Sequence, residues 1–280
     1  MKVELKTWTQ LGVATALAGL TVAGCSGEAG EGGETGEGAA MQQAGEAGEG
    51  EGGEGGEGTG GEGGEGGVDV AAAADDPVVY SSALAVAEAH VIAARDAYEA
   101  GEREAGAEMF AHPVSEVLLE LQPVFDARGV EDMSPLFAGA SEAALSGVEP
   151  SEINSQAEVI FAALRAAEEK APQSDKSAGK IAAGVVADQI ERAVAMYAQA
   201  SESTRYGAYL DGYGYYRTAA VTFERSVDAI RDEDAQLATS IEKALALLAK
   251  AYPSVTRPEN LNVNQGELSG ASASVLLAAS

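Results

Sequence analysis

The chain has 280 residues and a formal net charge of −28 at pH 7, from 45 acidic and 17 basic side chains. This acidic excess argues against a nucleic-acid-binding protein, which needs a basic surface to neutralise phosphates, and against attachment to anionic lipid by charge alone. One cysteine excludes internal disulfides and multi-cysteine metal clusters, and two histidines exclude a three-histidine metal centre within one chain.

The amino-terminal residues have the pattern of a secretory signal. Lys2 and Lys6 precede an apolar run over residues 11–23, which ends in small side chains. The run is shorter than the roughly 20 apolar residues that a transmembrane helix needs. We therefore expect residues 1–24 to be a signal peptide that is removed from the mature protein.

The end of this run carries a specific motif, Val22-Ala23-Gly24-Cys25. It resembles the lipobox of bacterial lipoproteins, in which an aliphatic and two small residues precede a lipidated cysteine. The resemblance implies that Cys25 becomes the first mature residue and that its acyl chains anchor the protein to a membrane. Ser26 stands where aspartate signals inner-membrane retention in that family, so the resemblance implies the outer membrane, facing the periplasm. The alternative is a free cysteine in an uncleaved segment.

Residues 25–70 are expected to form a disordered tether. Residues 26–67 contain 20 glycines and 11 glutamates but no lysine or arginine. Glycine leaves the backbone free and the glutamates repel one another, so this segment cannot bury an apolar core. A spacer between membrane and domain is the interpretation we favour, because glutamates on a flexible chain lack the preformed cage of tight calcium sites.

Residues 71–280 are predicted to form one all-α domain, an up-and-down helical bundle. They are rich in alanine, leucine and glutamate and lack the alternation typical of strands. Asp76-Pro77 is a suitable start for a first helix that is apolar on most sides and therefore central in the bundle. His112-Pro113 is expected to start a new helix. The expected helices cover 77–100, 102–110, 112–129, 132–146, 151–171, 178–231 with a break near 201–205, 233–251 and 267–279.

The sequence contains no catalytic motif, such as a GxSxG, Walker or HExxH motif, so we do not expect an enzyme. His112 and Glu116 are four residues apart and would share one helix face, from which an imidazole and a carboxylate can reach one metal ion. His90 and a further carboxylate such as Asp211 would complete a site for a divalent or ferric ion if all four converge in one cavity. The alternative is structural, with His90 a hydrogen-bonded core residue and Glu116 on a solvated face.

Tyrosines recur at helical spacing later in the chain, at Tyr206, Tyr209, Tyr213 and Tyr216. One interpretation is a core seam between packed helices. The other is the aromatic wall of a ligand groove, or phenolate ligands for ferric iron. Glycines between these tyrosines are expected to allow close helix contact or a kink.

The segment Phe110-Ala111-His112-Pro113-Val114-Ser115-Glu116 distantly resembles a motif of imelysin-like periplasmic proteins, and the domain is similar to the periplasmic helical domain of bacterial iron permeases. Those proteins are helical bundles tied to iron uptake. The imelysin-like motif has glycine before its histidine and glutamate three residues after it. Here alanine precedes His112 and Glu116 follows four residues later.

These observations predict an outer-membrane-anchored periplasmic lipoprotein whose helical domain binds a ligand, with a metal such as iron as the candidate, in envelope transport. The alternative is a structural lipoprotein of the cell envelope that docks a protein partner and binds no small molecule. The sequence leaves the oligomeric state open.

Overall fold

The computed structural model describes residues 67–280, which form helices and no strand in this range. The predicted all-α class is therefore confirmed. The predicted signal peptide, Cys25 and nearly all of the predicted tether lie outside the described residues. The elements are α1 (Val70–Asp75), α2 (Pro77–Glu99), α3 (Arg103–Pro113), the π-helical turn η1 (Val114–Leu118), α4 (Leu119–Arg128), α5 (Ser134–Ser146), α6 (Pro150–Glu168), α7 (Ala178–Glu202), α8 (Tyr206–Glu233), α9 (Ala235–Ala251) and α10 (Gln265–Ala279).

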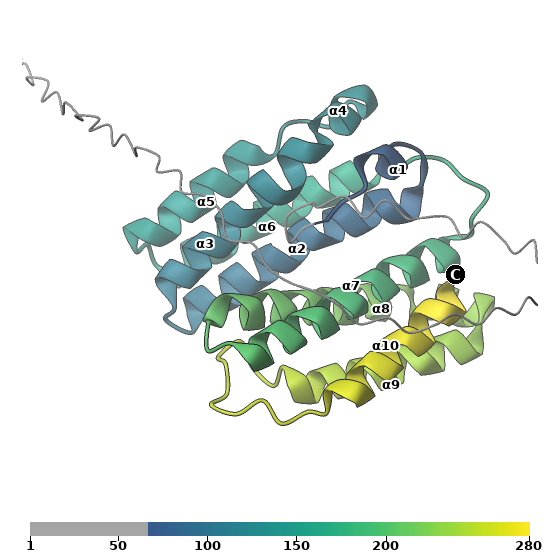
Figure 1. Cartoon of the computed structure of the whole chain (residues 1–280). Helices are drawn as coiled ribbons and strands as arrows, with labels where there is room; N and C mark the ends of the chain where they lie inside the picture. The colour runs from purple at the N-terminus through teal and green to yellow at the C-terminus, as the bar shows by residue number, and fades with distance from the viewer. Residues whose placement is uncertain (1–66) are drawn as a thin grey trace, which may run out of the picture. The chain divides into compact units, whose positions relative to one another are not determined.

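Helix α2 is the centre of the bundle. It packs against α3 and α6 on one side and against α7 and α8 on the other (Figure 1). By length and composition α2 could also cross a membrane, but 83% of its most apolar stretch is buried inside the protein, as expected for a core helix. Helices α9 and α10 pack against each other and against α7.

The ends of α2 follow the expected chemistry. The Asp76 side chain accepts a hydrogen bond from the backbone N–H of Val78, and Pro77 occupies the first turn. After the helix, Gly101 has a φ of 93°, a backbone conformation that favours glycine. The sharp turn at Gly101 brings α3 back against α2.

The prediction of a new helix at His112-Pro113 is wrong, because α3 continues without a break through η1 into α4. Proline lacks an N–H, and its ring clashes with the carbonyl one turn earlier. Here the chain widens into a π turn, in which the N–H of Leu119 donates to the carbonyl oxygen of Val114, five residues back. Pro113 therefore widens the helix instead of starting one.

The predicted break near residues 201–205 is confirmed, since α7 ends at Glu202 and α8 starts at Tyr206. Helix α8 then approaches α2 very closely at Gly214. A Cβ at that position would overlap the carbonyl oxygen of Ala89, so only glycine allows this contact. The predicted role of the glycines among the tyrosines is borne out here, but Gly207 has no neighbour near enough to require it.

Candidate metal centre

The four predicted ligand residues converge in the structure, although they come from four elements. His90 lies on α2, His112 on α3, Glu116 on η1 and Asp211 on α8. The Nε2 atom of His90 lies 3.5 Å from Oε2 of Glu116 and 3.6 Å from Oδ1 of Asp211. The imidazole rings of His90 and His112 are 5.8 Å apart between centroids.

The orientation of the His90 ring is set by its own helix. Its Nδ1 lies 2.8 Å from the carbonyl oxygen of Val86, one turn earlier. A carbonyl oxygen only accepts, so Nδ1 carries the proton and donates it. In the neutral ring the lone pair is therefore on Nε2, the atom that faces Glu116 and Asp211. Metal-binding histidines are commonly oriented in this way by a backbone carbonyl.

Burial keeps His90 neutral at physiological pH. The side chain is only 2% exposed. Desolvation of the charged form lowers the pKa of His90 to about 4, and the positive charges of His112 and Arg192 act in the same direction, while the hydrogen bond to Val86 opposes them. A neutral imidazole is the form that coordinates metal ions.

The π turn brings Glu116 into the cluster. Its two carboxylate oxygens face different histidines: Oε2 faces His90, and Oε1 lies 3.9 Å from Nδ1 of His112. Nδ1 of His112 is buried and has no hydrogen-bond partner among the residues that the structure describes. The other ring nitrogen, Nε2, lies 3.7 Å from Glu108 at the surface. The His112 ring thus lies between the exposed carboxylate of Glu108 and the largely buried carboxylate of Glu116.

The distances in the cluster suit a metal ion. Ligand atoms about 2.1 Å from a tetrahedral ion lie roughly 3.4 Å from one another. The distances from His90 to Glu116 and to Asp211 are close to this value. One ligand atom from each of His90, His112 and Asp211 lies within 4.8 Å of the other two, so small side-chain movements could close the set around an ion.

Three further residues border the cluster that the sequence did not indicate. The ring of Tyr215 stands perpendicular to the His90 ring at 5.9 Å. The pKa of Tyr215 is raised, first by burial and then by the charge of Asp211, so its hydroxyl stays protonated. Arg192 lies over the Tyr215 ring and pairs with Asp188 at 3.0 Å. Glu108 is four residues before His112, a spacing that could have revealed it.

The tyrosine stripe lies elsewhere on α8 and makes structural contacts. The hydroxyls of Tyr206 and Tyr209 donate hydrogen bonds to the carbonyl oxygens of Val255 and Ser254, in the loop after α9.

The other two tyrosines of the stripe also contact other elements of the bundle. The hydroxyl of Tyr213 donates a hydrogen bond to Asp96 on α2 and accepts one from Arg217. Tyr216 stacks on the buried Tyr252. These contacts are those of a core seam, and the ligand-groove interpretation stays an untested prediction.

Comparison with known proteins gives no further guide to the site. No protein-family model, curated protein or solved structure matches the chain.

Proposed function

We propose that the helical bundle binds one transition-metal ion through His90, His112, Glu116 and Asp211, and that the protein serves metal transport in the cell envelope. The observation that carries this proposal is the convergence of the His90 lone pair with carboxylate oxygens of Glu116 and Asp211 at 3.5 and 3.6 Å. Each of these three atoms offers a lone pair, so a metal ion placed between them would be attracted to all of them.

The donor set narrows the class of ion. Two imidazoles with two carboxylates suit divalent zinc, iron or manganese, and ferric iron as well. Calcium and magnesium prefer an all-oxygen set, which this cluster does not provide. Iron agrees with what the resemblance to imelysin-like proteins and iron permeases implies.

Native mass spectrometry of the full chain tests the proposal. We expect one ion per chain with Fe²⁺, Fe³⁺ or Zn²⁺ and none with Ca²⁺ at the same concentration. Replacing His112 by alanine should remove the adduct, because an imidazole supplies one of the coordinating bonds. Replacing Glu120 by glutamine is the matched control, since Glu120 is exposed one turn after Glu116 and outside the cluster.

The outcomes separate the two functions that the sequence left open. If no ion adds stoichiometrically to the full chain, the metal proposal is wrong. The cluster is then a polar core in which Arg192 supplies the positive charge, and a structural envelope protein becomes the better account. Equal loss of metal in the His112 and Glu120 variants would also contradict the site, because it would show nonspecific binding to an acidic surface.

The envelope location rests on the lipobox resemblance at Cys25. We propose that this cysteine carries the lipid anchor and holds the bundle at the outer membrane. The test is to express the protein in a bacterial host and to measure the mass of the mature protein. We expect the mass of acyl chains on Cys25 in the wild-type protein and its loss in the Cys25→Ala variant. An unmodified cysteine in the wild-type chain would refute the anchor without affecting the metal proposal.

A further inference from the structure

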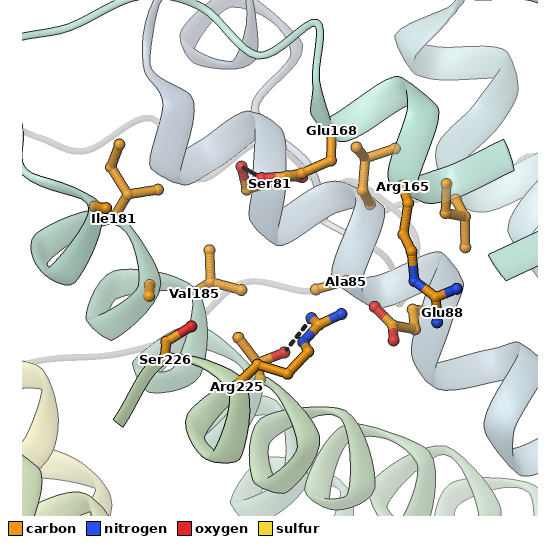
Figure 2. A pocket seen from close by; sticks show the side chains of 14 residues that line it. Ser81, Ala85, Glu88, Arg165, Glu168, Ile181, Val185, Arg225 and Ser226 are labelled. Atoms are coloured by element: carbon orange, nitrogen blue, oxygen red, sulfur yellow. Dashed lines mark hydrogen bonds between the residues drawn. The ribbon is translucent and has the colours of Figure 1, made fainter. Parts of the chain in front are cut away.

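A concave site lies between α6 on one side and α7 and α8 on the other, with α2 as its floor (Figure 2). Its volume of about 410 Å³ falls within the range of small-molecule sites, roughly 300–1,000 Å³. The lining is mostly apolar, with Leu84 and Ala85 from α2, Leu164 from α6, and Ile181 and Val185 from α7. We call this site the α2 groove.

The α2 groove is separate from the candidate metal centre. Glu88 lines the groove and His90 belongs to the metal centre, only two positions further along α2. Two residues correspond to about 200° of rotation around a helix, so these side chains leave α2 on opposite sides. A function of the groove therefore does not depend on the metal proposal.

Three of the four charged side chains that line the groove gather at one end, while the fourth, Glu168, accepts a hydrogen bond from Ser81. Figure 2 shows the guanidinium groups of Arg225 and Arg165 on either side of the Glu88 carboxylate. No hydrogen bond or ion pair to Glu88 forms within residues 67–280. Among the described residues, the guanidinium of Arg225 makes one hydrogen bond, a long one of 3.4 Å to Thr222.

We propose that the α2 groove binds a free α-amino acid with an apolar side chain. Such a molecule carries an ammonium and a carboxylate on one carbon, next to an apolar group. Glu88 would accept hydrogen bonds from the ammonium, and Arg225 would donate to the carboxylate. The side chain would lie along the groove toward Val185 and Ile181, where it buries apolar surface. The neighbouring charges of Glu88 and Arg225 are thus opposite in sign to the neighbouring ammonium and carboxylate of the ligand.

The groove fits other ligand classes less well. A simple carboxylate would satisfy Arg225 but would leave Glu88 facing a second anion. A simple amine would satisfy Glu88 but not the arginines. An acidic amino-acid side chain would face the Glu168 carboxylate, which also lines the groove, or lie against Leu84 and Ala85, and burying a charge in either place is unfavourable. An apolar zwitterion supplies a partner of opposite charge to both Glu88 and Arg225.

Calorimetric titration of the full chain with L-leucine tests this proposal. We expect saturable binding at one site, and binding at least about tenfold weaker for 4-methylpentanoate and for 3-methylbutylamine, because each lacks one charge-assisted contact. L-Glutamate should bind at least as weakly as these analogues. Lack of saturable leucine binding would overturn the proposal, and so would an analogue that binds as tightly as leucine.

Variants locate the binding in the groove. Glu88→Gln and Arg225→Met should each weaken leucine binding by about tenfold or more, whereas Glu191→Gln and Arg231→Met, outside the groove on α7 and α8, should not. Circular dichroism must show that each variant keeps its helices, and native mass spectrometry should show an unchanged metal adduct. If both groove variants bind leucine as the wild type does, the assignment of the site is wrong.

Discussion

The Nε2 atom of His90 lies 3.6 Å from Oδ1 of Asp211, although the two residues belong to different helices, α2 and α8. The contact depends on the close approach of these helices at Gly214, one turn after Asp211. The carbonyl oxygen of Ala89, the neighbour of His90, occupies the space that a side chain at position 214 would need. One glycine thus sets the distance between two proposed ligands.

Substitution of Gly214 by alanine should therefore damage both the fold and the site. The added methyl group overlaps α2, and such overpacking destabilises a protein by about 1–3 kcal/mol. We expect the free energy of unfolding to fall by this amount in urea titrations, and metal affinity to fall as Asp211 moves away from His90.

Gly207→Ala is the matched control on the same helix, because nothing lies within 4 Å of the added Cβ. Alanine favours a helix over glycine by up to about 1 kcal/mol, so this variant should be equally stable or more stable. A Gly214 variant with the stability and the metal affinity of the Gly207 variant would contradict the close contact.

Asp211→Asn should reduce metal affinity without unfolding the bundle. The amide has nearly the shape of the carboxylate but lacks its charge, so attraction to a cation is lost. We expect an affinity at least about tenfold lower than that of the wild type. Competition with a chromophoric chelator measures this change, and unchanged affinity would remove Asp211 from the ligand set.

Glu108→Gln should change how fast the ion enters more than how tightly it is held. The Glu108 side chain is 69% exposed and lies 3.7 Å from His112, which is 26% exposed and leads on to the buried His90. An exposed carboxylate raises the local concentration of cations at the entrance. Stopped-flow mixing with metal should show slower association at low salt, with a smaller difference at high salt, where charges are screened. Identical rates at low salt would exclude this role.

Alkaline pH should unfold the protein through its buried tyrosines. Burial raises the pKa of Tyr80 and of Tyr206 to about 12, from 10.0 for an ordinary phenol, and raises that of Tyr209, Tyr213 and Tyr252 as well. Above pH 10 the unfolded chain releases protons that the folded chain keeps. These residues therefore leave the free energy of unfolding unchanged below pH 10 and lower it as the pH rises further.

Urea unfolding at several pH values between 8 and 12 measures this decline, and the absorbance of tyrosinate reports the ionisation directly. Tyr80→Phe should make the decline less steep, although it also removes the hydrogen bond from the Tyr80 hydroxyl to Ala167. Tyrosines that all ionise near pH 10 in the folded protein would contradict the burial.

Some local features could be read from residue types alone. Asp76-Pro77 and Gly101 delimit α2 because a capping carboxylate, a proline in the first turn and a glycine with positive φ have local causes. The central position of α2 followed from its apolar character on most sides. The error at His112-Pro113 has a physical reason too, since proline can start a helix or widen one, and packing against neighbouring helices decides between them.

The candidate metal centre was only partly predictable. Spacing along one helix indicated His112 and Glu116 and could have indicated Glu108, because these residues are separated by single turns. Tyr215 lies four residues after Asp211 on α8, so the same spacing could have indicated it, whereas no spacing indicates Arg192, which reaches the cluster from α7. The α2 groove was not foreseen at all, since its lining comes from four helices with no common motif.

The sequence by itself determined the helical class, the ends of several helices and the residue types available for metal binding, because propensity, capping and periodicity act over a few neighbouring residues. Only the tertiary structure decided that His90 meets Asp211 and that Glu88 faces a groove on the opposite side of the same helix. Those contacts depend on how helices distant in the chain pack together, and that packing is set by the shapes of whole helix faces rather than by local patterns.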